Sequence, residues 1–272
     1  MKTLHYIQVL YLSLTVCLFI QILAPDTVMS KDYEFSAGEK LVFEVKWTFI
    51  KAAEVTLEIL PEEDIDGKPA LHFLYTAKTS KFVDTFYKVR DRIEAFTDTD
   101  LTHALLYRKR HDGKSVKDVS IVFDWGKMEA RYIDNINSEK TIDPVQINEN
   151  TFDPLSVFYA FRIGQPDENN EIITHVSDGK KVVKATGKIL KKQKIRVEGK
   201  AYNTLLVEPE IEGVSGVFKK TSDSKLRIWV TDDKLRIPVR IKSKVTVGSF
   251  VANLISYKPG RDDSCVSSKE TE

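Results

Sequence analysis

The chain has 272 residues, with 41 Lys and Arg against 40 Asp and Glu, for a formal net charge of +1. This balance gives no general attraction to nucleic acid, and no dense Lys/Arg block supplies a local one. One of the two cysteines, Cys17, lies in the N-terminal segment described next, so a disulfide framework is excluded from the rest of the chain.

The first 30 residues have the pattern of a secretory signal. Lys2 supplies a positive charge, residues 6–24 are almost continuously apolar, and residues 28–30 have small or modest side chains, so we expect cleavage after Ser30. An uncleaved membrane anchor is the alternative, because the apolar run approaches spanning length. We expect residues 1–30 to be the signal peptide, 31–258 a single β-rich domain, and 259–272 a polar, disordered tail.

From Lys40 onward, apolar and polar residues alternate, which is typical of half-buried strands. The alternation runs through Trp47 and resumes in later segments up to Tyr257. Three Asp-Gly pairs, at 66–67, 112–113 and 178–179, predict tight turns between strands.

Residues 80–87 interrupt this alternation, and their spacing fits either a short helical turn or an irregular bend. In the next predicted strand, Asp91 falls on the apolar side. A buried carboxylate needs a partner, for which an arginine is the obvious choice. We interpret Asp91 as one member of a structural ion pair, with catalysis as the alternative.

Two predicted strand regions in the second half carry many cations. Residues 188–200 are strongly basic, so we expect a solvent-facing or edge strand. Residues 226–230 and 235–239 share a pattern and predict a hairpin, with its inward side formed by Leu226, Ile228 and Val230 and matched by Leu235, Ile237 and Val239. Its other side carries Arg227, Trp229, Arg236 and Arg240, and there an arginine can stack on the indole.

Residues 151–164 are the one segment that clearly predicts a helix. Asp153 is a good N-cap, Pro154 fits the first helical position, and Gly164 is a C-terminal stop that tolerates positive φ. Because the helix is apolar on nearly all sides, it must be covered, and a sheet wrapped around it is the natural cover. We therefore predict an all-β fold: a strongly curved antiparallel sheet or incomplete β-barrel with one short central apolar helix on the concave side.

No strong catalytic motif is present, and the four histidines beyond residue 30 lack the spacing of a metal site. We expect no catalytic residue, metal or cofactor. The candidates for a ligand groove are aromatic and apolar side chains, with ordinary core packing as the alternative. They are Trp47, Val157, Phe158, Phe161 and Trp229.

Four stretches, residues 38–47, 87–92, 153–162 and 228–239, resemble a bacterial family of secreted proteins known as domain of unknown function 3108. The resemblance covers nearly the whole chain after the leader and implies a periplasmic or other cell-envelope location, reached by secretion across the inner membrane. It implies no catalytic residue. The hairpin from Trp229 to Val239 is also similar to one in periplasmic lipoprotein carriers, where a curved sheet wraps apolar helices.

These observations support three functional hypotheses. The first is a non-enzymatic envelope protein that binds a lipid or other apolar ligand in the curved sheet. The second is a structural or interaction module that docks an envelope protein partner through a sheet edge or the basic residues 188–200. The third is an unrecognised hydrolase that uses Asp91 or the pair Asp232 and Asp233. We expect no nucleic-acid partner, and membrane contact only through the leader if it is retained.

Overall fold

The computed structural model describes residues 36–137, 142–211, 226–244 and 249–260. The chain divides into two compact units, residues 1–32 and 33–272, and every described residue belongs to the second. The predicted signal peptide and residues 261–272 of the predicted tail therefore lie outside the described residues.

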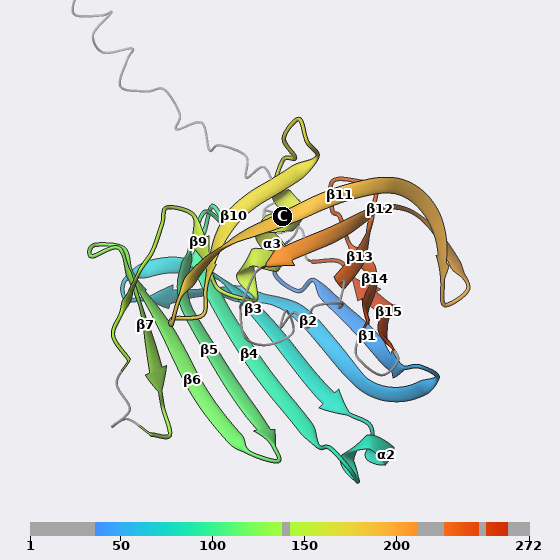
Figure 1. Cartoon of the computed structure of the whole chain (residues 1–272), viewed down its shortest axis with the longest axis horizontal. Coiled ribbons are helices and arrows are strands. Elements are labelled where there is room, and N and C mark those ends of the chain that lie inside the picture. Colours follow the sequence, from blue (N-terminus) through green and yellow to red (C-terminus); the bar gives the residue numbers. More distant parts are fainter. Residues whose placement is uncertain (1–35, 138–141, 212–225, 245–248, 261–272) are drawn as a thin grey trace, which may run out of the picture. The chain divides into compact units, whose positions relative to one another are not determined.

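The described residues contain fifteen strands, which form one sheet in the order β8-β7-β6-β5-β4-β3-β2-β1-β15-β14-β13-β12-β11-β10-β9 (Figure 1). The first eight are β1 (Lys40–Trp47), β2 (Ile50–Ile65), β3 (Lys68–Thr79), β4 (Val89–Asp98), β5 (Ala104–Gly113), β6 (Val116–Asp124), β7 (Glu129–Asp134) and β8 (Val145–Gln146). The others are β9 (Thr151–Phe152), β10 (Glu171–Ser177), β11 (Val182–Val197), β12 (Lys200–Ile211), β13 (Leu226–Thr231), β14 (Pro238–Lys244) and β15 (Ser249–Lys258).

The sheet has two halves that meet at the antiparallel pair of β1 and β15. Successive antiparallel pairs lead from β1 outward to β8, and the chain then returns through β9 to β15. The pair β9–β10 is parallel. Because β8 and β9 are the two ends of the strand order, the sheet is open, and the prediction of a curved, mainly antiparallel sheet or incomplete barrel is confirmed.

Breaks in strand register account for much of the bending. The pairing shifts at Leu60/Glu63 in β2 and at Ile189/Lys191 in β11, the two longest strands of the described chain. An extra residue on one strand bends it and increases its local twist. The curvature therefore arises at positions that the alternation of side chains does not reveal.

The predicted Asp-Gly turns differ in outcome. Asp66 and Gly67 have φ of 54° and 80°, which confirms the first turn, and Gly179 at 76° fits the third. The second turn lies two residues later than predicted: Asp112 pairs with Val116 and β5 extends through Gly113, so the turn is formed by residues 114–115.

Two helices are described. α2 (Lys81–Asp84) settles the ambiguous residues 80–87 as a short helical turn. α3 (Ser156–Ile163) is the predicted central helix, although it begins later than expected because residues 151–152 form β9 and residues 154–155 form a turn. Figure 1 shows α3 between the two halves of the sheet.

The hairpin of β13 and β14 was predicted correctly as a hairpin but in the wrong register. Val230 pairs with Pro238 and Trp229 with Arg240. Residues 235–237 belong to the connecting turn, where Arg236 has a φ of 42° and the Thr231 N–H donates to the Ile237 carbonyl. The second arm of the hairpin therefore begins at Pro238, so Leu235 and Ile237 are not its strand residues.

Candidate functional site

The start of α3 is organised by a buried aspartate. Asp153 is fully buried, and its Oδ1 accepts the backbone N–H groups of Leu155 (2.7 Å) and Ser156 (3.0 Å), while its Oδ2 accepts the Ser156 hydroxyl (2.5 Å). Burial raises the pKa of the Asp153 carboxyl to about 6. The capping role expected for Asp153 is confirmed, since it satisfies N–H groups that the first turn leaves free.

The end of α3 does not have the positive φ expected at Gly164, which lies at −56°. Glycine is needed there for another reason. A Cβ on Gly164 would lie 2.5 Å from Cγ2 of Ile172 in β10, closer than real contacts allow. The absence of a side chain therefore allows β10 to pack tightly against the helix end.

The two sides of α3 face different halves of the sheet. Tyr159 is fully buried and stacks on Phe73 of β3, with ring centroids 4.0 Å apart, and Val157 belongs to the same cluster. Phe158 and Phe161, three residues apart and so on one helix face, line a groove whose other wall is the second half of the sheet. Val157 therefore lies in the core, and Phe158 and Phe161 lie at the groove.

A buried ion pair joins α3 to the centre of the sheet. Arg162 Nη1 and Nη2 donate to Glu39 Oε1 and Oε2 at 2.6 Å and 3.0 Å, and both side chains are 2% exposed. The Arg162 Nε also donates to the Leu235 carbonyl at 3.1 Å. One side chain thus ties the helix to the residue before β1 and to the β13–β14 turn.

A second arginine binds the C-terminal end of α3. Nη1 of Arg236 donates to the carbonyl groups of Phe161, Arg162 and Gly164, at 3.4 Å and 3.3 Å for the first two. The last carbonyls of a helix lack partners within it, and a cation favours their negative dipole end. Burial lowers the pKa of Arg236, but a guanidinium stays charged at neutral pH. Arg236 forms no ion pair with any described carboxylate.

The groove between α3 and the second half of the sheet is lined mainly by apolar residues. Its volume is about 510 Å³, including space open to solvent. Its lining residues are Phe158, Phe161, Ile172, Gly187, Ile189, Leu205, Val207, Pro209, Ile228 and Val230, together with Arg162 and Arg236. Phe161 packs closely on Gly187, since its ring lies 3.3 Å from where a Cβ would stand.

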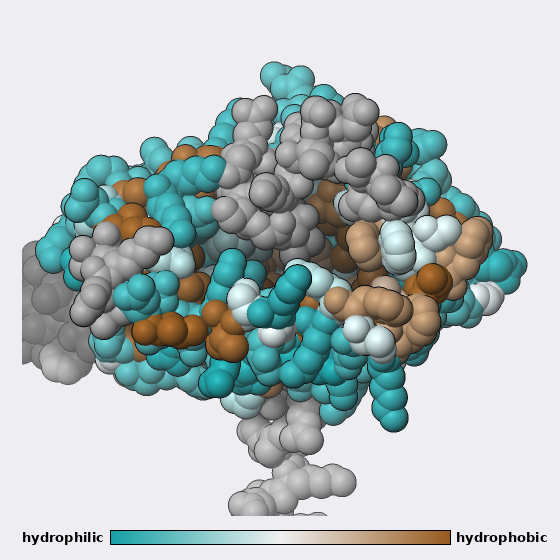
Figure 2. Space-filling model, turned by 60° about the horizontal axis from the view of Figure 1, so that its bottom comes forward, coloured by the Kyte–Doolittle hydropathy of each residue, from teal (hydrophilic) through white to brown (hydrophobic). Residues whose placement is uncertain are grey.

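Figure 2 shows a hollow in the face that it turns forward, with hydrophobic residues inside and hydrophilic residues along much of its rim. The space enclosed by the curved sheet is thus not filled to the surface on this side.

The two tryptophans that were predicted to line a ligand groove, Trp47 and Trp229, lie outside it. Trp47 is 40% exposed at the end of β1. Trp229 lies between Ile228 and Val230 in β13, so its side chain points to the opposite face of that strand and packs against the main core. Of the arginines predicted to share a face with Trp229, Arg236 binds the end of α3 instead, and Arg240 is the cross-strand neighbour of Trp229.

Asp91 has a different partner from the one predicted. Its Oδ1 contacts Nδ1 of His111 across the β4–β5 pair, and both side chains are 18% exposed. The expected arginine partner is wrong for Asp91, whose ion-pair partner is His111, and the carboxylate is half-buried. The deeply buried carboxylate–arginine pair of the described chain is Glu39–Arg162, which sequence reasoning missed although Arg162 stands out as a cation in an apolar helix.

The acidic residues proposed for a hydrolase do not converge. Asp232 binds Nζ of Lys192 at 3.0 Å, and Asp233 accepts the Thr231 hydroxyl at 2.7 Å. Asp91 lies on β4, whereas Asp232 and Asp233 follow β13, which is six positions away from β4 in the strand order of the sheet. Among the described residues no cluster of three or more His, Cys, Asp or Glu could hold a metal ion.

The basic residues 188–200 are partly at an edge. Residues 185–188 of β11 pair with both β10 and β12, whereas from Lys191 onward the described ladder continues with β12 alone. Lys191, Lys192 and Lys194 are exposed there. The expectation of a solvent-facing or edge strand fits this second part of β11.

Within the described part of the chain, neither helix has the length and apolarity needed to cross a lipid bilayer.

Comparison with known proteins decides the family. The model of a family described as protein of unknown function (DUF3108) matches residues 42–255. The chain belongs to this family. No curated protein matches the chain. Sequence comparison therefore assigns the chain to DUF3108 and gives no function for it.

A solved structure from Brucella abortus shows a similar fold. The chain is similar to a β-barrel-like protein of another domain of unknown function, DUF1849, from Brucella abortus, with a TM-score of 0.51, 11% identity, and coverage of 83% of this chain and 98% of that one. A Bacteroides fragilis protein with a YmcC-like fold, described as exported, matches with a TM-score of 0.34, 8% identity and the same coverage. At such low identity the Brucella protein shows the fold of this DUF3108 member and nothing of its function.

Proposed function

We propose that this protein is a non-enzymatic protein of the cell envelope that binds a lipid or another apolar ligand in the groove between α3 and strands β10–β13. The observation that carries the proposal is the lining of that groove. Ten of its twelve residues are apolar, glycine or proline, and they come from both the helix and the sheet. Concave, mostly apolar pockets with few polar groups are typical of small-molecule sites.

The charge in the groove favours a ligand with an acidic head group. Arg162 is neutralised by Glu39, but Arg236 lines the groove and has no carboxylate partner among the described residues. The hydrogen bonds of its guanidinium to described residues all use Nη1, which leaves Nε and Nη2 for a ligand. A single acyl chain with a carboxylate or phosphate head would match an apolar groove that carries one such cation.

Direct binding tests this proposal. The protein is purified after export, its bound lipids are extracted and identified by mass spectrometry, and the delipidated protein is titrated with cis-parinaric acid and with the neutral dye N-phenyl-1-naphthylamine. We expect saturable binding of both probes, with the acid bound more tightly. No extracted lipid and no uptake of either probe would contradict the proposal.

Adjacent residues on opposite faces of one strand provide matched variants. Ile172 of β10 lines the groove, whereas its neighbour Ile173 is 47% exposed and does not. Ile172→Trp should fill the groove and weaken probe binding about tenfold or more, while Ile173→Trp should change it by less than about twofold. Ile189→Asp and Leu190→Asp form a second pair on β11, because Ile189 lines the groove whereas Leu190 is 42% exposed and does not. If the two variants of each pair weakened probe binding equally, the probes would not bind in this groove.

The exposed edge of β11 supports a second candidate, a module that docks an envelope protein partner. The three exposed lysines at residues 191, 192 and 194 lie where β11 has no second neighbouring strand in the described sheet. Reversing their charge to glutamate should remove a partner from a pull-down out of the native host, whereas an unchanged set of partners would count against this function.

A further inference from the structure

A second apolar surface lies at one end of the sheet, away from α3. It combines the β1–β2 turn, α2 with the residues that follow it, and the start of β15. We call it the α2 rim. Trp47 pairs with both Ile50 and Phe250, and the Ser80 hydroxyl donates to the Lys51 carbonyl at 2.9 Å. These contacts show that segments distant in sequence lie side by side at this end.

The α2 rim exposes large aromatic side chains. Phe49 is 91% exposed, Phe86 76% and Phe82 61%, and the rings of Phe82 and Phe86 meet edge to face with centroids 5.7 Å apart. Trp47, Tyr87 and Phe250 at the same end are exposed as well. Several large exposed aromatic side chains gathered at one end of a sheet are unusual on a protein surface and mark an interaction surface.

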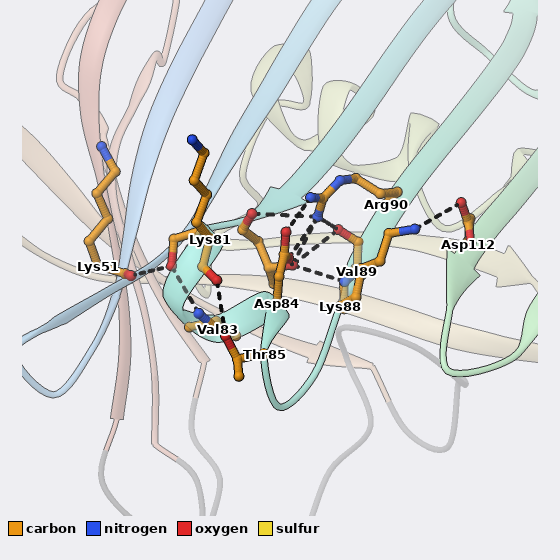
Figure 3. A network of polar contacts seen from close by, with 11 residues as sticks. Lys51, Lys81, Val83, Asp84, Thr85, Lys88, Val89, Arg90 and Asp112 are labelled. Atoms are coloured by element: carbon orange, nitrogen blue, oxygen red, sulfur yellow. Dashed lines mark hydrogen bonds and ion pairs between the residues drawn. The ribbon is translucent and has the colours of Figure 1, made fainter.

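α2 has no buried residue of its own, so hydrophobic packing does not hold it in place. A polar network does so instead (Figure 3). Asp84 accepts from Nη1 and Nη2 of Arg90 at 3.0 Å and 2.5 Å, and the Thr79 hydroxyl donates to Asp84 and accepts the Val89 N–H at 2.9 Å. The hydrogen bonds from Arg90 and Thr79 lower the pKa of Asp84 to about 2. The network therefore keeps the aromatic pair presented to solvent without help from a core.

The α2 rim is also positively charged in a chain that is nearly neutral. Its segments, residues 46–51, 78–90, 242–244 and 249–250, contain a single carboxylate, Asp84. Their cations are Lys46, Lys51, Lys78, Lys81, Lys88, Arg90, Lys242 and Lys244. Nearby carboxylates offset some of this charge, since Glu44 binds Lys46 and Lys51, Asp112 binds Lys88, and Glu54 pairs with Lys78 across the strands. A positive excess remains.

We infer that the α2 rim docks on the surface of a lipid bilayer that contains anionic head groups. Aromatic side chains favour the interface between head groups and acyl chains, and lysines close to it are attracted by anionic lipids. The rim supplies both in one patch, which matches a lipid surface in apolar character and in charge. This inference rests on surface residues alone and is independent of the groove, although β13, which lines the groove, begins at the same end of the sheet.

Vesicle flotation tests this inference. The chain is purified after export, its N-terminus is established by mass spectrometry, and it is mixed with phosphatidylcholine vesicles with or without about one third phosphatidylglycerol. We expect flotation with the anionic vesicles, weaker flotation with the neutral ones, and a loss of binding at high salt. Failure to float with either vesicle would overturn the inference, as would capture of a protein through the rim without vesicle binding.

Matched variants identify the surface responsible. The triple variant Phe49→Ser, Phe82→Ser and Phe86→Ser should lower vesicle partitioning about tenfold or more, whereas Ile133→Ser, Ile173→Ser and Ile255→Ser, at exposed apolar positions elsewhere, should change it by less than about twofold. Lys81→Glu with Lys244→Glu should weaken binding to anionic vesicles more than Lys181→Glu with Lys184→Glu. Equal losses in rim and control variants would overturn the inference. Probe binding in the groove should be unchanged in the rim variants.

Discussion

Glu39 and Arg162 lie 123 residues apart in sequence and form a two-point ion pair at 2.6 Å and 3.0 Å, with both side chains 2% exposed. Glu39 directly precedes β1, the strand at which the two halves of the sheet meet, and Arg162 lies in the last turn of α3. This pair therefore fixes the helix that forms one wall of the proposed groove to the middle of the sheet.

Removing one member of this pair should be strongly destabilising. Arg162→Met leaves the Glu39 carboxylate buried without a partner, and we expect the free energy of unfolding to fall by about 3–5 kcal/mol. Replacing both, as in Glu39→Leu with Arg162→Met, should recover much of that loss, because no charge is then left buried. Urea denaturation of the single and double variants measures both effects.

The control is the exposed pair Lys192–Asp232, in which the lysine side chain is 74% exposed. Lys192→Met should cost no more than about 1 kcal/mol, because solvent screens that pair. If Arg162→Met were as mild as the control, the buried pair would not be what anchors α3.

The carboxyl group of Asp153 should make stability depend on pH. Its pKa is raised from 3.8 to about 6 in the folded chain, so the folded state binds more protons than the unfolded state between these values. The contribution of Asp153 to stability is therefore greatest below pH 4 and decreases as the pH rises to 6. Asp153→Asn removes this titration and keeps an oxygen acceptor for the first turn of α3.

Unfolding of wild type and Asp153→Asn across pH 4 to 7 checks this prediction. The stability of the variant relative to wild type should improve by about 3 kcal/mol over that range, given 1.36 kcal/mol for each unit of pKa shift. A constant difference between the two proteins would show that Asp153 titrates alike in the folded and unfolded states.

Arg236 should stabilise the last turn of α3 against local unfolding. In Arg236→Gln the carbonyl groups at the helix end lose a cationic donor, and we expect a loss of about 1–2 kcal/mol in stability. The Gly164 N–H, which donates to the Ala160 carbonyl at 2.9 Å, should exchange its hydrogen faster. Arg227→Gln, at an exposed position of β13, is the control and should leave that exchange rate unchanged.

Gly164→Ala should strain the contact between α3 and β10. The new Cβ would lie 2.5 Å from Ile172 Cγ2, and we expect a loss of about 1–3 kcal/mol in the free energy of unfolding. Ile172→Ala removes that methyl group, so the double variant should be more stable than the sum of the two single effects implies. Gly126→Ala, whose Cβ would meet nothing closer than 3.4 Å, should be mild. Additive effects at residues 164 and 172 would mean that the contact is not strained.

Local patterns in the sequence predicted much of the fold correctly. The alternation from Lys40 onward identified most of the strands, though not the short β8 and β9, and Asp153 with its apolar successors identified α3. Such patterns succeed because side chains alternate across a strand and repeat about every 3.6 residues in a helix, which are properties of neighbouring residues. The same reasoning failed where the register was decided by a longer connection, as at Leu235–Ile237, which extend a turn rather than a strand.

By itself, the sequence determined the class of the fold, the helix and its cap, and the membership of a family. Only the tertiary structure decided which groups meet. It brought Glu39 to Arg162, Arg236 to Gly164, and His111 rather than an arginine to Asp91. It also turned Phe158 and Phe161 toward the groove and Val157 toward the core. The reason is that these contacts depend on the order, register and bulges of strands distant in sequence, and none of these leaves a local periodic signal.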